Sequence, residues 1–590
     1  MAQWGWGTVA LVGLGTAAMT TVARAETALQ VVYPPDGHQT TAAQIFLIGT
    51  GAADSPVLIN GEPIAERSGA GHFAPSRPLA LGPNTFTLTQ GDQTLVITVT
   101  RVAPGPSLPA TLGFAEGSLL PAVDTALAPG DWVCLGASAP ASAPASATVS
   151  ASLAGQTYQL LPQGAQTLPP NSAVLIDQAQ PTAGPTRYES CFRAETPGDL
   201  GQPTYRLSQG GDTVMAPAPG SYSILNPSAV EVVAVTVPAG VARSGPSTDY
   251  SRLTPLPQGT RARVTGREGD WLRLDYGGWI RAAETQPVAG AAGVRSRIRG
   301  VTSRQVPGWT ELYFPLEVPV PVSVRQDTDQ FTLTLHNTVP QTDTIYVTAD
   351  GLVERLDWSP LPPDQVEYRI HLKTAQQWGY KLRYEGSTLV LSLRQPPALQ
   401  GAGPLAGTTI LVDPGHGGDE LGARGPDGTP EKAVNLTVSL LLRQALEARG
   451  ARVVMTRTDD STLPVNDRPA QINQVEPTLA LSIHYNALPD GGDAETTAGI
   501  GAFWFNTQSH SLAQFLHDHL VAELERPSYG VFWNNLALTR PHVAPAVLLE
   551  LGFMINPDEF EWVTDPAAQA ALADTLAEGV ARWVQQTAGD

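Results

Sequence analysis

A change of sequence pattern near residue 407 divides this chain of 590 residues into two unlike parts. Before it, short runs of Val, Thr and Leu alternate with Gly and Pro, which is typical of β-strands joined by turns. After it, apolar runs alternate with longer helical patterns, which is typical of a mostly parallel sheet covered by helices on both faces. The chain is also too long for one hydrophobic core. We therefore expect a multidomain protein, with several all-β domains followed by a C-terminal α/β domain.

Charge and cysteine content narrow the class of protein. A net charge of −20 disfavours nucleic acid and anionic membrane surfaces as partners, because both select for basic patches. The two cysteines, Cys134 and Cys191, fall in the same predicted β region. In an exported protein such a pair suits one disulfide, and two buried free thiols are the alternative.

The N-terminus has the features of an export signal. An apolar stretch runs from Trp4 to Met19, and Ala23-Arg24-Ala25 fits a small-residue cleavage site. We therefore expect residues 1–25 to be a signal peptide, with a retained apolar anchor helix as the alternative. No other stretch approaches the roughly 20 apolar residues that cross a bilayer. The expected location is the periplasm or the cell wall, and the protein is expected to be peripheral there rather than membrane-spanning.

Two β domains are expected after the signal. Residues 27–103 contain strand-like runs around the hairpin signal Asn60-Gly61, which indicates a small immunoglobulin-like sandwich. Residues 106–226 form a second β domain that holds the cysteine pair.

Two further β domains resemble modules of cell-wall hydrolases. Residues 228–288 contain Gly269-Asp270-Trp271 and Gly277-Gly278-Trp279-Ile280, and they resemble the bacterial SH3-like barrel. Residues 292–396 resemble the AMIN-type wall-targeting domain in their strand content and their place in the chain. A linker is expected at 397–407, and the last domain spans 408–588.

The α/β domain brings polar residues to one edge of its predicted sheet. His416 follows the first strand, His484 and Glu550 each follow an apolar strand, and Glu431 opens the first helix. Ligands gather at the carboxyl ends of parallel strands. Two imidazoles and a carboxylate suit Zn²⁺ with a position open for water, and a further carboxylate could accept a proton from that water. Polar strand ends occur in any α/β domain, so topology alone leaves the metal site open. Asp413 is either a competing ligand or a residue that fixes the Gly-rich turn.

Four blocks of the α/β domain resemble one enzyme family, the zinc-dependent N-acetylmuramoyl-L-alanine amidases of the AmiC type (the Amidase_3 family). The positions of Thr456-Arg457 and Arg468 also match that family. The blocks are Leu411-Val412-Asp413-Pro414-Gly415-His416-Gly417-Gly418, Glu431-Lys432-Ala433-Val434-Asn435-Leu436, Leu481-Ser482-Ile483-His484-Tyr485-Asn486-Ala487 and Val547-Leu548-Leu549-Glu550-Leu551-Gly552-Phe553-Met554-Ile555-Asn556.

The resemblance implies a function and a set of site residues. It implies that zinc is bound by His416, Glu431 and His484, and that Glu550 is the catalytic carboxylate. Asp413, Asn486 and Arg457 are the candidates for supporting roles. The implied reaction is hydrolysis of the amide between N-acetylmuramic acid and L-alanine in peptidoglycan, which serves cell-wall remodelling or septal splitting.

Three questions stay open at the level of sequence. The same metal chemistry would serve a zinc peptidase that acts on stem peptides, and an inactive amidase fold would serve as a wall-binding scaffold. Some family members carry a helical insertion that blocks the zinc, whereas the segment 486–501 is short and lacks helical periodicity here. We therefore expect an unblocked catalytic site.

Overall fold

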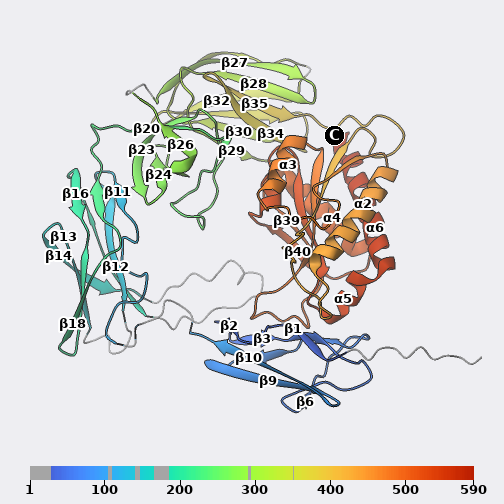
Figure 1. The fold of residues 1–590 in the computed structure, drawn as a ribbon. Helices are drawn as coiled ribbons and strands as arrows, with labels where there is room; N and C mark the ends of the chain where they lie inside the picture. The colour runs from blue at the N-terminus through green and yellow to red at the C-terminus, as the bar shows by residue number, and fades with distance from the viewer. Residues whose placement is uncertain are drawn as a thin grey trace, which may run out of the picture.

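The chain forms a curved row of β-rich domains that starts and ends beside one α/β domain. The computed structural model describes residues 28–103, 109, 111–139, 147–164, 185–289, 294–349 and 351–589, so the expected signal peptide at 1–25 lies outside the described residues. Figure 1 shows the β-rich part running from blue through green to yellow, with the blue N-terminal domain next to the orange and red C-terminal one. Within the described residues, no helix is both long and apolar enough to cross a bilayer.

The first β-rich domain is built on the hairpin that the sequence predicts at Asn60-Gly61. Both residues have positive φ, which suits a two-residue turn between β5 and β6. The domain's sheets have the strand orders β1-β4-β7, β2-β10-β9-β5-β6 and β3-β8. The strands are β1 (Gln30–Tyr33), β2 (His38–Thr40), β3 (Gln44–Phe46), β4 (Ile48–Thr50), β5 (Leu58–Ile59), β6 (Glu62–Pro63), β7 (His72–Phe73), β8 (Ser76–Pro78), β9 (Gly82–Gln90) and β10 (Gln93–Arg101).

The second β-rich region contains the cysteine pair, which the structure joins in a disulfide. Cys134 and Cys191 face each other across the antiparallel strands β12 and β15. Most strands form the sheet β12-β15-β14-β13-β17-β18. The strands are β11 (Thr125–Leu127), β12 (Trp132–Ala139), β13 (Thr148–Leu153), β14 (Gln156–Pro162), β15 (Thr186–Arg193), β16 (Gly198–Gly201), β17 (Thr204–Gln209), β18 (Asp212–Pro217) and β19 (Tyr222–Ile224).

The third segment shares a sheet with the second. Strand β11 pairs with β23, so the sheet β16-β19-β11-β23-β20-β26 crosses the boundary expected near residue 227. The segment's own elements are β20 (Val232–Val235), β21 (Ala239–Gly240), β22 (Leu256–Pro257), β23 (Arg261–Glu268), β24 (Trp271–Leu274), β25 (Trp279–Arg281), the 3-10 turn η1 (Ala282–Glu284) and β26 (Thr285–Pro287).

The fourth β-rich domain packs two sheets around one core. Their orders are β31-β27-β28-β35-β34 and β29-β30-β33-β32, and side chains of both sheets share a cluster that includes Phe314, Phe331 and Tyr368. The strands are β27 (Ser296–Val306), β28 (Trp309–Pro315), β29 (Val322–Gln326), β30 (Gln330–Leu335), β31 (Thr338–Tyr346), β32 (Val353–Leu361), β33 (Gln365–Leu372), β34 (Tyr380–Glu385) and β35 (Thr388–Arg394).

The α/β domain has a six-stranded sheet in the order β37-β36-β38-β41-β39-β40. Only the pair β39 and β41 is antiparallel, so the expected mostly parallel sheet is confirmed. Its elements are β36 (Thr409–Pro414), α2 (Glu431–Ala448), β37 (Arg452–Met455), α3 (Asp467–Val475), β38 (Leu479–Asn486), β39 (Ile500–Trp504), η2 (Thr507–Ser509), α4 (His510–Glu523), β40 (Ser528–Trp533), η3 (Ala537–Thr539), β41 (Ala546–Phe553), α5 (Pro557–Thr564) and α6 (Pro566–Ala588).

Alternating apolar residues of the strands cover both faces of this sheet. Ile410 and Val412 of β36 point into the larger core, which α2, α4, α5 and α6 complete. Leu411 points the other way, toward Ile472 of α3 and Leu538 of η3. The segment expected as a linker at 397–407 is coil and turns, and its Leu405 is fully buried in the larger core.

The N-terminal domain packs on the segment that follows His484 of the α/β domain. Phe46 and Ile48 share a buried cluster with Ala494, Phe553 and Ile555. Because Phe553 ends β41, the contact lies at the carboxyl edge of the sheet.

Polar contacts reinforce the same interface. The hydroxyl of Tyr33 donates to Asp490, His38 Nε2 lies 2.9 Å from Asp490 Oδ2, and Gln44 Nε2 donates to the carbonyl of Gly491 at 2.9 Å. Burial opposes the ionisation of Asp490, but hydrogen bonds from Thr40, Tyr33 and His38 outweigh it and lower the pKa of this carboxyl. Asp490 is therefore the polar centre of the contact.

Substitution Asp490→Ala should loosen the N-terminal domain from the α/β domain. The change leaves the partly buried Tyr33 and His38 without their acceptor, at a cost of about 1–3 kcal/mol. We expect faster hydrogen exchange in residues 487–499 and in β1 to β3. Asp92→Ala removes an exposed carboxylate at the β9–β10 turn and serves as the control. Equal exchange in the two variants would contradict the role of Asp490.

Candidate active site

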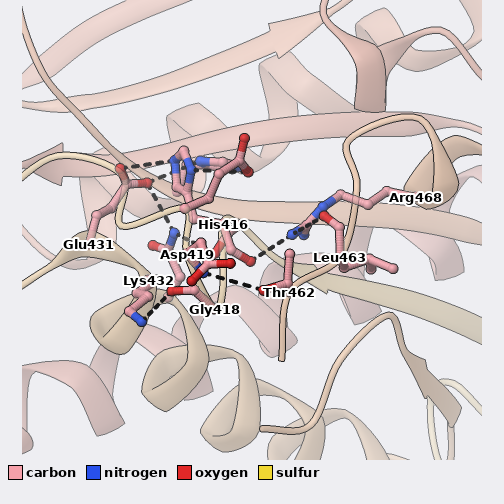
Figure 2. Close-up of polar contacts among 12 residues, drawn as sticks. His416, Gly418, Asp419, Glu431, Lys432, Thr462, Leu463 and Arg468 are labelled. Atoms are coloured by element: carbon pink, nitrogen blue, oxygen red, sulfur yellow. Dashed lines mark hydrogen bonds and ion pairs between the residues drawn. The ribbon is translucent and has the colours of Figure 1, made fainter. Parts of the chain in front are cut away.

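Three side chains that can ligate a metal converge at the carboxyl edge of the α/β sheet. His416, Glu431 and His484 each present a ligand atom within 4.8 Å of the others. Glu431 Oε2 lies 3.1 Å from His416 Nε2, and Glu431 Oε1 lies 3.0 Å from His484 Nδ1. The imidazole rings are 4.9 Å apart and meet nearly at right angles. The three residues that the sequence analysis named as metal ligands therefore lie together in the structure, and Figure 2 shows Glu431 facing His416.

The backbone places His416 in an uncommon conformation. Its φ is 57°, in the left-handed region that residues other than glycine rarely adopt. The neighbouring glycines allow this turn to approach the other ligands closely. A Cβ on Gly415 would overlap the ring of His484, and a Cβ on Gly422 would overlap Glu431 and His416. The Gly-rich sequence around His416 is thus required by the packing of the site itself.

Glu431 is buried and fully hydrogen-bonded. Its Oε1 accepts from Asn435 Nδ2 at 3.0 Å and from the backbone N–H of Tyr485 at 3.1 Å, and its Oε2 accepts from Ala423 N at 2.9 Å. Burial works against ionisation, but hydrogen bonds and charge interactions with His416 and His484 outweigh it and hold the pKa of Glu431 far below its usual value. Glu431 is therefore an anion, as a metal ligand must be.

Glu550 has the opposite environment. It pairs in register with His484 across β38 and β41, so it lies beside the three convergent residues. Its buried Oε2 has no hydrogen-bond partner within the part of the chain that the structure describes. Burial, and after it the negative charge of Glu431, raises the pKa of Glu550 well above its usual value. The site thus pairs one strongly acidic carboxyl group with one weakly acidic one.

Two buried arginines hold the turn that carries His416. Arg468 donates to the carbonyls of Pro414 at 2.8 Å and His416 at 2.6 Å. Arg457 donates to the carbonyls of Pro414 at 3.0 Å and Gly415 at 2.8 Å. Figure 2 shows Arg468 reaching across to this turn from the side opposite Glu431.

Asp413 forms an ion pair with Arg468 and is not one of the three convergent residues. Its Oδ1 accepts from Arg468 Nη1 at 2.8 Å and from Thr456 Oγ1 at 2.6 Å, and its Oδ2 accepts from Ser482 Oγ at 2.7 Å. Both oxygens are therefore engaged. Of the two alternatives for Asp413, the geometry favours the residue that fixes the turn.

Asn486 lies close to His484, whereas the histidines His517, His519 and His542 belong to other segments of the domain. Asn486 follows His484 on the same face of β38, and its Oδ1 accepts from the N–H of Ala487 at 2.8 Å. His517 and His519 are buried in α4 and are not joined to the site. His542 lies before β41, and its ring centre is 4.6 Å from that of Tyr380 in the fourth domain.

Sequence reasoning missed the part that Asn435 plays in the site. This fully buried side chain donates to Glu431 and to the carbonyl of Gly415, at 3.0 and 3.2 Å. Its place one helical turn after Glu431 is the signal that could have revealed it, since residues four apart share a helix face.

Comparisons with known proteins match two parts of the chain to known families. The family model described as N-acetylmuramoyl-L-alanine amidase matches residues 410–582, and the model described as bacterial SH3 domain matches residues 241–286. A probable cell wall amidase LytH of Staphylococcus epidermidis is 31% identical over 182 residues, which are 30% of this chain and 60% of the relative. The chain thus spans about 60% of the length of the first such relatives.

A second relative is covered over most of its length. The germination-specific N-acetylmuramoyl-L-alanine amidase of Bacillus subtilis is 30% identical over 202 residues, which are 30% of this chain and 81% of the relative. The crystal structure of an N-acetylmuramoyl-L-alanine amidase from Clostridium difficile is 30% identical, with a TM-score of 0.29, and the match covers 30% of this chain and 96% of that one. This chain therefore belongs to the N-acetylmuramoyl-L-alanine amidase family, and it carries a bacterial SH3 domain.

Removing Arg468 should destabilise the catalytic edge strongly. Its side chain and that of Asp413 are 4% and 1% exposed, and Arg468→Met would leave Asp413 as an uncompensated buried charge. Such a loss costs about 3–5 kcal/mol. Native-state hydrogen exchange of β36 and β38 should report this loss as a lower free energy of opening.

The control for this experiment is a surface ion pair in the same domain. Arg582→Met breaks the exposed pair with Glu578 and should change the opening free energy by less than about 0.5 kcal/mol. If the two substitutions had equal effects, the buried pair would not support the turn as described.

Proposed function

We propose that this protein hydrolyses the amide between the lactyl group of N-acetylmuramic acid and L-alanine in peptidoglycan. The observation that carries the proposal is the convergence of His416, Glu431 and His484 beside Glu550, inside the domain that matches the amidase family. The names of the relatives, which include probable cell wall amidases, support the same substrate.

We propose Zn²⁺ as the metal at this site. Two imidazoles and one carboxylate are the ligand types that zinc takes in hydrolases, with a further position left for water or substrate. The Oε2 atom of Glu550 lies beside these three residues and has no hydrogen-bond partner within the described residues, which fits a site that binds one further polar partner. When bound, zinc supplies a Lewis acid that lowers the pKa of water and polarises a carbonyl.

Glu550 is the proposed proton carrier. Its free oxygen accepts a proton from the water that attacks the lactyl carbonyl, and then donates this proton to the nitrogen of L-alanine as the C–N bond breaks. The products are a carboxylate on the glycan and a free amine on the peptide. A group with a raised pKa suits the second step, because it can hold the proton until the amine leaves.

The supporting residues have two different proposed roles. Asp413 and Arg457 hold the Pro414–Gly415 turn, so His416 has one orientation before substrate arrives. Asn486 lies on the His484 face of β38, where it would contact substrate at the edge of the site.

The upstream domains are proposed to hold the enzyme at the cell wall. The SH3 domain supports this role, as does the absence of a spanning helix from the described part of the chain. We propose that residues 1–25 direct export, that the first domain is immunoglobulin-like, and that the domain at 292–396 is of the AMIN type. The enzyme would then act in the periplasm or cell wall during wall remodelling.

Digestion of purified peptidoglycan by the full chain tests the reaction. An amidase releases peptides with free N-terminal L-alanine and leaves the glycan strands intact. New amino termini at other stem residues would instead indicate a zinc peptidase, and no release at all would indicate a wall-binding scaffold.

Substitution Glu550→Gln should lower turnover while leaving metal content unchanged. Loss of general acid–base catalysis lowers rates by about 10²–10⁴-fold. Glu447→Gln, on the exposed face of α2, removes an equal charge and should keep full activity. Undiminished peptide release by Glu550→Gln would refute the assigned role.

Metal content tests the ligand set separately from activity. Purified protein should contain zinc, and dialysis against a chelator should remove both the metal and the activity. His416→Ala and His484→Ala should fail to retain zinc by elemental analysis, whereas His371→Ala, in the fourth β-rich domain, should retain it. Zinc retention in both site variants would exclude this ligand set.

A further inference from the structure

A cavity lies where the third and fourth β-rich domains meet the α/β domain. Its volume is about 300 Å³, and side chains of all three domains line it. The lining residues are Val241, Arg252, Leu253, Thr254, Pro255, Val324, Arg325, Gln326, Tyr380, Phe505, Asn506, Thr507, Arg540 and His542. We refer to it as the junction cavity.

The junction cavity is cationic although the protein is strongly acidic. Each of the three domains contributes one arginine, namely Arg252, Arg325 and Arg540, and its lining within the described residues contains no Asp or Glu. The whole chain carries a net charge of −20. The positive charge around this small cavity, to which three domains contribute, therefore contrasts with the negative charge of the whole protein.

One of the three arginines of the cavity, Arg325, has a carboxylate partner within the described residues, and the other two do not. Arg540 donates through Nε to Asn535 Oδ1 at 2.7 Å, which is a neutral partner. The buried Nε of Arg252 has no hydrogen-bond partner within the described residues. Arg325 has only Asp327 nearby, at 3.7 Å, and both side chains are largely exposed.

The surroundings of Arg252 disfavour the charged form of its side chain. Burial, followed by the positive charges of Arg540 and Arg243, lowers the pKa of Arg252 to about 10. Arg252 therefore stays charged at neutral pH, and the repulsion remains unrelieved. An anion in the cavity would relieve it.

The other walls add donors and a preformed shape. Asn506 Nδ2 donates to the carbonyls of Arg540 at 2.9 Å and Pro541 at 3.0 Å, which fixes the loop beside Arg540. Asn506 and Thr507 also lie at the start of the 3-10 turn that leads into α4. They are therefore close to the N-terminus of this helix, which is the positive end of its dipole. Leu253, Phe505 and Tyr380 supply apolar surface for a carbon skeleton.

The junction cavity is separate from the catalytic site. Phe505 follows β39, which runs antiparallel to β41, and Arg540 and His542 precede β41. The cavity therefore lies at the amino end of β41, whereas Glu550 and His484 lie toward its carboxyl end. It does not belong to the zinc and glutamate group described above.

We propose that the junction cavity is a binding site for a small ligand that carries a carboxylate or phosphate group, and that this ligand bridges the three domains through Arg252, Arg325 and Arg540. Arginine is the side chain best suited to these oxyanions, because its planar fork donates two parallel hydrogen bonds. The volume matches the lower end of small-molecule sites, so the ligand is a short peptide, sugar acid or phosphate ester rather than a polymer segment. The proposal does not depend on the amidase activity.

Calorimetric titration of the full chain at low ionic strength tests the site. We expect N-acetyl-glutamate, glycerol phosphate or both to bind with Kd below about 1 mM, and the neutral N-acetyl-glutamine amide not to bind. If only one of the two anions binds, the result identifies whether the site recognises a carboxylate or a phosphate group. Binding of the neutral amide as tightly as the anions, or binding of none of the three, would overturn the proposal.

A pair of matched double variants locates the binding. Arg252→Gln with Arg540→Gln should weaken binding of the anion by about tenfold or more, because the charge-assisted hydrogen bonds of two guanidinium groups are lost. Arg206→Gln with Arg299→Gln removes two exposed arginines and the same net charge outside the cavity. Equal weakening by both pairs would show a general charge effect and contradict the site.

Hydrogen exchange of the unmodified protein makes the test independent of whether the variants fold. Saturating anion should protect residues 252–255, 324–326 and 505–507 together, because the ligand would bridge the three domains. Protection in one domain alone, or in none, would contradict a bridging ligand.

Discussion

The buried ion pair between Asp413 and Arg468 supports the rest of the catalytic edge. Arg468 brings a positive charge into the interior, and this charge is tolerated because Asp413 and two backbone carbonyls surround it. In return the arginine fixes the turn in which His416 adopts its left-handed conformation. Without this restraint the turn would relax toward more common backbone angles, and the imidazole would leave Glu431. The turn that carries His416 is thus held by a charge pair that includes none of the three proposed metal ligands.

The same edge is also where the first β-rich domain packs on the α/β domain. Tyr33 and His38 of the first β-rich domain contact Asp490, six residues after His484. The segment 487–499 contains turns and no helix, so the expected absence of a helical insertion is confirmed, while the openness of the site stays a prediction. A short segment of turns has little structure of its own, and the apolar contact of Phe46 and Ile48 with Phe553 gives it a fixed support. The N-terminal domain therefore shapes one border of the catalytic edge.

Much of the site could be predicted because local pattern and topology coincide there. An apolar run followed by Gly415 and His416, and a helix that opens with Glu431, place both residues at one sheet edge wherever the strands are parallel. The structure adds contacts that no local pattern encodes. Arg468 reaches Asp413 across 55 residues, and Tyr33 reaches Asp490 across 457. Helix α3 and strand β40 were missed as well. Of the apolar residues of α3 only Ile472 is buried, and β40 is an edge strand of mostly half-buried residues, so neither shows a clear periodicity.

The two ends of strand β41 have opposite electrostatic character. Toward its carboxyl end, burial and then the negative charge of Glu431 raise the pKa of Glu550. At its amino end, burial and then the charges of Arg540 and Arg243 lower the pKa of Arg252, and burial and then the charge of Arg243 lower the pKa of Arg540. Each end therefore stores repulsion between like charges that a bound ion of opposite sign would relieve: a metal cation beside the carboxylates and an oxyanion beside the arginines. Strand β41 thus connects the candidate catalytic edge with the cavity that the third and fourth β-rich domains help to line.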